Sequence, residues 1–275
     1  MRAGERVALI GGGNMAEALA RGWLASGLLD AGQIVVGEPR EDRRAHWRER
    51  HRVLALADNR AALRGAAVAV LAVKPQVMAP VLAELAAEPF AGLWISIAAG
   101  VPLRVLAGAL GAGGRFIRAM SNTPAMAGAG VSALCAGAAA TASDLTAARR
   151  LLAAVGEVVE VDERHMDAVT AVSGSGPAYF FYLAELLAQA GRELELPDDV
   201  AARLARATLA GAAALLAQET ADPAELRRRV TSPGGTTAAA LAALAEPDWA
   251  GQFRRAVRAA AARSREMSGS VPAAG

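Results

Sequence analysis

The stretch Val7-Ala8-Leu9-Ile10-Gly11-Gly12-Gly13-Asn14-Met15-Ala16 decides the fold of this chain of 275 residues. Its four apolar residues predict a buried strand, which runs into the pattern Gly-x-Gly-x-x-Ala and then into a helix of small residues. Gly11 permits a tight turn, Gly13 lets the backbone approach a pyrophosphate, and Ala16 keeps the helix close to the strand. Free N–H groups at the helix N-terminus favour phosphate. The stretch therefore predicts a dinucleotide-binding site; a glycine-rich turn without a ligand is the alternative.

The composition indicates a cytoplasmic protein with no membrane contact. Hydrophobic residues make up 54% of the chain and aromatic residues only 4%, which predicts helices packed closely through small side chains such as alanine. No apolar run approaches the ~18 residues that a membrane span requires. The first expected strand also begins so close to the start of the chain that we expect no signal peptide before it.

Charge, cysteine and histidine exclude several classes of site. The net charge of +2 is too small to indicate binding to nucleic acid. The single cysteine, Cys135, excludes an internal disulfide and a cysteine-based metal cluster, and its small apolar neighbours indicate an inert core thiol. The three histidines, His46, His51 and His165, are scattered along the chain. They form no ligand pattern, so we expect no metal.

Further strand-like runs follow the first and alternate with helical segments. They lie at residues 34–36, 53–57, 67–73, 94–97, 116–120, 131–135 and 158–161, with a helix near 144–155 between the last two. Continuous apolar runs of this kind are typical of parallel strands that are buried on both faces. After Asp162 the strand-like runs cease. We therefore predict an α/β Rossmann domain, doubly wound with a mostly parallel sheet, over residues 1–162, followed by an all-α domain over residues 163–275.

Several of the predicted strands end in small or polar residues. Because the carboxyl ends of parallel strands meet at one rim, and ligands of doubly wound sheets bind at that rim, these residues are candidates for contact with the cofactor. In chain order the candidates are Gly11, Gly13, Asn14, Met15, Glu38, Arg40, Asn59, Ala72, Val73, Lys74, Pro75, Ala98, Ala99, Gly100 and Asn122.

The residues after the second strand give conflicting indications of which cofactor binds. Glu38 lies 22 residues beyond Ala16, close to the ~20-residue offset of the acidic residue that binds a ribose hydroxyl. Arg40, Arg43 and Arg44 follow it, and arginine is the residue that a 2′-phosphate requires. Glu38 alone favours NAD, whereas the arginines favour NADP. A charged surface loop without a ligand is the third interpretation.

Two polar stretches stand out in the predicted helical half. One runs over residues 167–179 and the other over residues 230–237. In the second, Pro233 is followed by Gly234 and Gly235, and this arrangement exposes successive backbone N–H groups at the start of a helix, which suits a small anion such as a carboxylate. A purely structural helix–helix turn is the alternative.

Taken together, these motifs resemble those of the pyrroline-5-carboxylate reductases over nearly the whole chain. The motifs that carry the resemblance are Ile10–Ala16, Ala72–Gln76, Arg118–Pro124, Ser173–Tyr179 and Thr231–Thr237, of which the last two are the most specific. Members of this family often have proline where this chain has Ser121, but the following Asn122-Thr123-Pro124 is intact.

The resemblance implies an enzyme that reduces 1-pyrroline-5-carboxylate, a small-molecule substrate, to L-proline by hydride transfer from NAD(P)H, the last step of proline biosynthesis. NADPH is favoured, with NADH as the alternative. The resemblance also implies that the helical half is a dimerisation domain. The expected assembly is a homodimer whose active site the partner subunit completes, with a larger ring of dimers as a further expectation.

The resemblance assigns roles to the residues of the second polar stretch. It implies that the substrate is bound by Val230, Ser232, Gly234, Gly235, Thr236 and Thr237. The loop would hold the substrate carboxylate through backbone N–H groups. Thr237 would be the catalytic residue, with its hydroxyl near the imine nitrogen.

The expected chemistry and its alternatives can be weighed on the residues. Hydride transfer to an iminium requires orientation and exclusion of water, which fits loops that offer hydroxyls and amides but no histidine. A β-hydroxyacid dehydrogenase resembles this layout but carries a catalytic lysine in its helical half, and Lys74 is the only lysine here. An imine reductase for another ring, and a nucleotide-binding protein without turnover, stay open.

Overall fold

The computed structural model describes residues 4–219, 221–246 and 248–270, which fall into two compact units. The first unit holds the chain up to Gly174 and the segment from Ala260 onward, and the second unit is Ser175–Ala259. The last helix therefore contributes residues to both units. The boundary expected at residue 162 stays a prediction.

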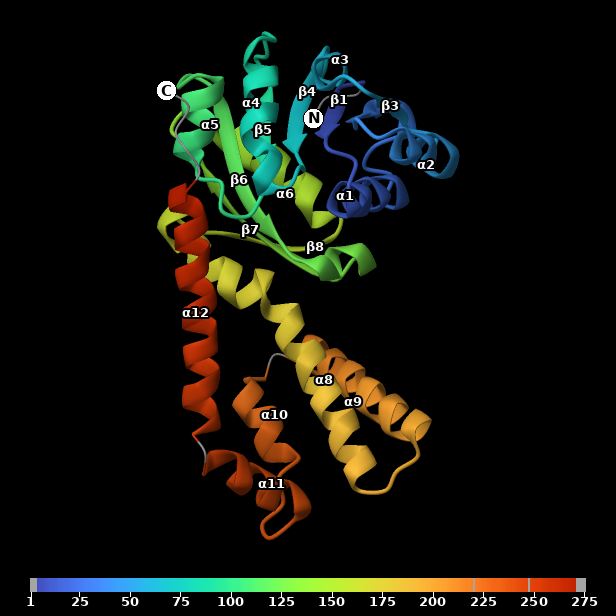
Figure 1. Cartoon of the computed structure of the whole chain (residues 1–275), viewed down its shortest axis with the longest axis vertical. Helices are drawn as coiled ribbons and strands as arrows, with labels where there is room; N and C mark the ends of the chain where they lie inside the picture. Colours follow the sequence, from blue (N-terminus) through green and yellow to red (C-terminus); the bar gives the residue numbers. More distant parts are fainter. Residues whose placement is uncertain (1–3, 220, 247, 271–275) are drawn as a thin grey trace. The chain divides into compact units, whose positions relative to one another are not determined.

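The first unit is built on one eight-stranded sheet with the order β3-β2-β1-β4-β5-β6-β7-β8 (Figure 1). All neighbouring strands are parallel except β6 and β7, which are antiparallel. The order reverses at β1, and such a switch point is where doubly wound sheets bind their ligands. The strands are β1 (Arg6–Ile10), β2 (Ile34–Gly37), β3 (Leu54–Leu56), β4 (Ala66–Leu71), β5 (Leu93–Ser96), β6 (Arg115–Ser121), β7 (Gly130–Ala136) and β8 (Gly156–Glu160).

Helices connect these strands and cover both faces of the sheet. They are α1 (Asn14–Ala25), α2 (Glu41–His51), α3 (Asn59–Leu63), α4 (Met78–Ala86), α5 (Leu103–Leu110) and α6 (Ala142–Ala153), and a further helix, α7 (Met166–Val169), follows the last strand. The core is divided accordingly, because successive strand residues point to opposite faces. Val7 and Leu9 pack with residues of α1, α2 and α6, whereas Ala8 and Ile10 pack with residues of α3, α4 and α5.

The expectation of a doubly wound, mostly parallel Rossmann sheet is therefore confirmed. Each strand-like run of the sequence forms a strand, although the run at 67–73 ends as a strand at Leu71. Ala72 and Val73 continue past the sheet edge toward the candidate site. Burial raises the pKa of the Cys135 thiol to about 11, which agrees with an inert core residue.

Within its described residues, the second unit has helices as its only regular secondary structure. Its helices are α8 (Gly176–Glu193), α9 (Asp198–Gln218), α10 (Pro223–Arg229), α11 (Thr236–Ala245) and the first part of α12 (Trp249–Ser270). Large apolar side chains of α8 lie exposed, among them Phe180, Phe181 and Tyr182, each more than half accessible. Large apolar side chains of α9, such as Leu204, are exposed as well, and contiguous exposed apolar patches are typical of surfaces that contact other molecules.

Candidate active site

A hollow of about 480 Å³ lies where β1, β2, β4 and β5 end. Its size is within the range of pockets that hold small-molecule ligands. The residues that line it are Gly13, Asn14, Met15, Glu38, Arg40, Arg43, Ala72, Val73, Lys74, Pro75, Ile97 and Ala99. Most of the residues predicted from the sequence to contact a cofactor are thus brought together. Arg43 and Ile97 line the hollow in addition.

The three glycines of the fingerprint have different physical reasons to be glycine. Gly11 has φ +99°, and a Cβ there would lie 2.8 Å from a methyl group of Val73. A Cβ on Gly12 would lie 2.7 Å from the indole nitrogen of Trp47. A Cβ on Gly13, in contrast, would meet no protein atom within 4 Å. The fold thus requires the first two glycines, while the third, which lines the hollow, leaves room for a ligand.

Glu38 joins the end of β2 to the glycine loop. Its side chain is 8% exposed. One carboxylate oxygen accepts the N–H of Gly12 at 3.0 Å, and the other accepts the N–H of Arg40, also at 3.0 Å. Because an ionised carboxylate has about four acceptor positions, Glu38 can hold the loop and still accept a ribose hydroxyl at the edge of the hollow.

The three arginines after Glu38 have separate partners. Arg44 donates to the carbonyl oxygens of Glu38 at 2.9 Å and Pro39 at 2.6 Å. Arg43 donates to the carbonyl oxygen of Gly12 and to Glu17. Arg40 pairs with Asp42, and both of these side chains are more than 60% exposed. Exposed pairs of this kind contribute little free energy, so the guanidinium of Arg40 can turn to another anion at small cost.

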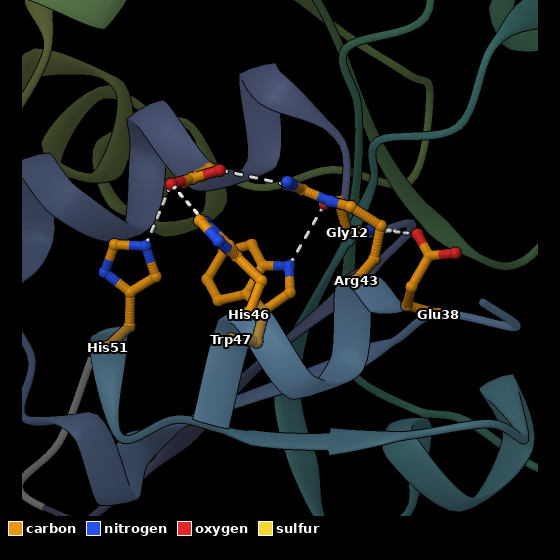
Figure 2. A network of polar contacts seen from close by, with 7 residues as sticks. Gly12, Glu38, Arg43, His46, Trp47 and His51 are labelled. Atoms are coloured by element: carbon orange, nitrogen blue, oxygen red, sulfur yellow. Dashed lines mark hydrogen bonds and ion pairs between the residues drawn. The ribbon is translucent and has the colours of Figure 1, made fainter. Parts of the chain in front are cut away.

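Glu17 of α1 accepts hydrogen bonds from three side chains of α2, all of which are labelled in Figure 2. One oxygen accepts Nε2 of His46 at 2.8 Å and of His51 at 3.0 Å, and the other accepts Arg43 at 2.9 Å. Partial burial acts to raise the pKa of Glu17, but these hydrogen bonds outweigh it and lower the pKa to about 2. Since an ionised carboxylate only accepts, both imidazoles carry their proton on Nε2.

The view that the histidines are scattered is therefore wrong for His46 and His51. Helix α2 presents both to Glu17, and the three ligand atoms lie within 4.8 Å of one another, close enough to hold a metal ion. In the structure the imidazoles donate to the carboxylate, and Arg43 occupies its second oxygen. That no metal binds stays a prediction.

Five predicted cofactor residues do not line the hollow. Gly11 shapes the turn, and Ala98 is buried beneath the rim. Gly100, with φ +71°, packs beside Met267 of α12.

The two predicted asparagines also lie outside the lining of the hollow. Asn59 donates to Glu84 at 2.9 Å. Asn122 accepts the N–H of Val131 at 2.9 Å and donates to the carbonyl oxygen of Ser173 at 3.2 Å. The side-chain amides of the two asparagines thus bond to neighbouring parts of the protein.

The second unit places the predicted substrate loop at the start of α11. Gly234 has φ +67°, a left-handed conformation that favours glycine. Gly235 precedes the helix in an extended conformation, and its N–H donates to the carbonyl oxygen of Ser232 at 3.1 Å. Thr236 and Thr237 then contribute N–H groups from the first turn of α11, where a helix has no internal acceptors for them. This end of the helix carries partial positive charge and suits a carboxylate.

The chain matches two family models that divide it between its halves. Residues 163–267 match the model described as pyrroline-5-carboxylate reductase dimerisation. Residues 6–100 match the model described as NADP oxidoreductase, coenzyme F420-dependent. The first match covers the helical half, and the second covers the glycine loop and the four strands that end at the hollow.

Comparisons over the whole length agree with these models. A pyrroline-5-carboxylate reductase of Synechocystis sp. is 42% identical over 262 residues, which are 95% of this chain and 98% of the relative. The solved structure of a pyrroline-5-carboxylate reductase from Coxiella burnetii has a TM-score of 0.90 at 36% identity, covering 96% of this chain and 98% of that one. A Plasmodium falciparum pyrroline carboxylate reductase with NADP bound has a TM-score of 0.86 at 25% identity, covering 98% and 100%.

Proposed function

This chain belongs to the pyrroline-5-carboxylate reductase family, and on that premise we propose which of its residues carry out the reaction. The protein reduces 1-pyrroline-5-carboxylate to L-proline by hydride transfer from NADPH, the final step of proline biosynthesis. We assign the cofactor to the hollow of the first unit and the substrate carboxylate to the start of α11. The observation that carries the assignment of this activity is the 42% identity to a pyrroline-5-carboxylate reductase over 95% of the chain.

The hollow fits a dinucleotide in three respects. Space is left in front of Gly13, the N-terminus of α1 offers N–H groups, and Glu38 and Arg40 lie at its edge. When bound, the reduced nicotinamide supplies the hydride that the imine carbon accepts. The part of this chain is to bind and orient both reactants and to keep water out.

In the second unit, the backbone N–H groups of the loop 232–237 would hold the substrate carboxylate, and the Thr237 hydroxyl would lie at the ring nitrogen. A cyclic imine that arrives protonated needs no strong acid from the protein. Val230, which is 63% exposed, would add an apolar contact to the ring. Initial rates with 1-pyrroline-5-carboxylate and each reduced cofactor test the proposal. Cofactor binding without imine-dependent oxidation would instead indicate a nucleotide-binding protein.

Arg40 is expected to set the preference for NADPH. The Arg40→Ala protein should show a KM for NADPH roughly ten- to a hundredfold higher, because it loses a charge-assisted contact to the 2′-phosphate. The KM for NADH should change little. Arg48→Ala is the matched control, since Arg48 of α2 is exposed and paired with a carboxylate, as Arg40 is just before this helix. Equal effects of Arg40→Ala on both cofactors would rule out a contact to the 2′-phosphate.

We further propose that the exposed apolar faces of α8 and α9 form the contact between two copies of the chain. By length and composition alone α9 could cross a membrane, although Arg203 and Arg206 interrupt its apolar residues, and only 11% of its most apolar window is buried within one chain. A dimer would cover this surface, which fits a cytoplasmic protein without membrane contact. The partner would complete the active site, and rings of dimers would extend the assembly.

Sedimentation should therefore show a dimer or a multiple of it at assay concentrations. Phe181→Asp places a charge on α8 where the side chain is 64% exposed, and should dissociate the assembly and abolish activity together. Leu54→Asp, at a 51% exposed position of β3 in the other unit, is the control and should leave the assembly intact. An active monomer would contradict the shared site.

A further inference from the structure

The middle glycine of the fingerprint, Gly12, is held by side chains at both its N–H and its carbonyl oxygen (Figure 2). Its carbonyl oxygen accepts the indole N–H of Trp47 at 3.0 Å. The same oxygen accepts Nη2 and Nε of Arg43 at 2.7 and 3.2 Å. Its N–H donates to Glu38 at 3.0 Å. Trp47 is fully buried, so its N–H has no water to replace this acceptor.

These contacts fix more than the position of Gly12. The peptide bond between Gly12 and Gly13 is trans, and in a trans peptide the C=O and the following N–H point in opposite directions. Holding the carbonyl oxygen of Gly12 toward α2 therefore fixes the Gly13 N–H on the side away from α2. Gly13 lines the hollow and has open space around its Cα. Glycine-rich segments are otherwise flexible, so a fixed direction for this N–H requires such external contacts.

The two side chains that bond the Gly12 carbonyl oxygen lie on one face of α2 together with two histidines. Arg43, His46, Trp47 and His51 follow the spacing i, i+3, i+4 and i+8, which places them along one side of a helix. The ring of His51 packs against Trp47 with centroids 5.2 Å apart. Glu17, bonded to both histidines, accepts Arg43 at 2.9 Å. Because Glu17 belongs to the first turns of α1, the arrangement ties this helix to α2 beside the loop.

We propose that Trp47 and Arg43 are positioning residues that orient the Gly12–Gly13 peptide for the pyrophosphate shared by NADPH and NADH. The proposal rests on the cofactor site assigned above. It separates the arginines by role: Arg40 distinguishes the cofactors by the 2′-phosphate, whereas Arg43 acts through Gly12 on both alike. Glu17, His46 and His51 keep the Arg43 guanidinium in place.

The test compares Trp47→Phe with Trp23→Phe. Trp23 is also fully buried, and its indole N–H donates to the carbonyl oxygen of Leu151 at 2.7 Å, so both variants lose the same kind of hydrogen bond. Dissociation constants are measured for NADPH and NADH by nicotinamide fluorescence, together with kcat at saturating cofactor. Trp47→Phe should raise both constants by the same factor, about three- to tenfold, with kcat within about twofold of the wild type. Trp23→Phe should lower the melting temperature without changing either constant.

If Trp47→Phe does not fold, Arg43→Gln provides a second test of the effect on cofactor affinity. It should also weaken NADPH and NADH by equal factors, in contrast to Arg40→Ala. If Trp47→Phe and Trp23→Phe change cofactor affinity equally, or not at all, Trp47 has a structural role only and the proposal falls. If Arg43→Gln weakens NADPH far more than NADH, Arg43 contacts the 2′-phosphate and its positioning role is wrong. A wild-type protein that binds neither cofactor would instead refute the cofactor site itself.

Discussion

A Gly13→Val protein is expected to fold as the wild type does and to bind NADPH and NADH at least roughly a hundredfold more weakly. The branched side chain would occupy the space in front of the loop that a pyrophosphate needs, and overpacking of this kind costs about 1–3 kcal/mol. Loss of charge-assisted hydrogen bonds from backbone N–H groups to phosphate would add a further ~1.5–3 kcal/mol. The fold should tolerate the change, because a Cβ on Gly13 meets no protein atom within 4 Å.

The measurements are a melting temperature without ligand and a titration with each cofactor. Gly32→Val is a matched control, because Gly32 also has open space around its Cα and lies outside the hollow. The Gly32→Val protein should keep the melting temperature of the wild type and its affinities for NADPH and NADH. Gly12→Val should differ from both, since its Cβ would collide with Trp47 and Glu38 and destabilise the unit. A Gly13→Val protein with unchanged affinity would show that the glycine loop does not contact the cofactor.

The Rossmann half could be predicted from the sequence because its signals are local. A continuous apolar run such as Ala67–Val73 indicates a strand buried on both faces, and a glycine pattern after such a run indicates the turn. Once the strands are parallel, their ends must share a rim, so Gly13, Glu38 and Lys74 could be grouped without knowing a distance. The structure does bring these three residues to the same hollow.

The contacts behind the rim could not be predicted in the same way. The sequence groups Arg43 with Arg40 and Arg44 as candidate partners of phosphate, because neighbouring arginines look alike in a sequence. Its bonds to Gly12 and Glu17 depend on how α2 packs against α1, which is a long-range property. The helical spacing of Arg43, His46, Trp47 and His51 was the available signal, and it indicated one shared face of α2.

Asn122 shows a second limit of sequence reasoning. Its position at the end of a strand correctly placed it near the rim, yet its amide bridges Val131 and Ser173 and does not line the hollow. Ser173 is distant in the sequence and Val131 lies on the next strand, so no local pattern distinguishes an asparagine that contacts a ligand from one that joins two segments. An asparagine that supports the rim can resemble one that binds at it.

The chemical step itself is best tested at Thr237. If its hydroxyl bonds the ring nitrogen, that interaction strengthens as hydride reaches the carbon and the nitrogen becomes an amine. A contact made mainly in the transition state lowers kcat when removed. One such polar contact contributes ~1.5–3 kcal/mol, so Thr237→Val should slow turnover roughly ten- to a hundredfold. Affinity for NADPH should stay near that of the wild type. Affinity for the substrate should fall by a smaller factor than kcat, because backbone N–H groups, which the substitution leaves in place, bind the substrate carboxylate.

Thr231→Val is the matched control in the same loop. The hydroxyl of Thr231 donates to the carbonyl oxygen of Arg227 at 2.6 Å, so it serves the end of α10 and has no assigned contact to the substrate. Its removal should leave kcat within about twofold, since a solvent-accessible hydrogen bond of this kind contributes little. A Thr237→Val protein with full turnover and a raised KM for the imine would mean that Thr237 only positions the substrate. The protonated imine would then accept hydride without help from this hydroxyl.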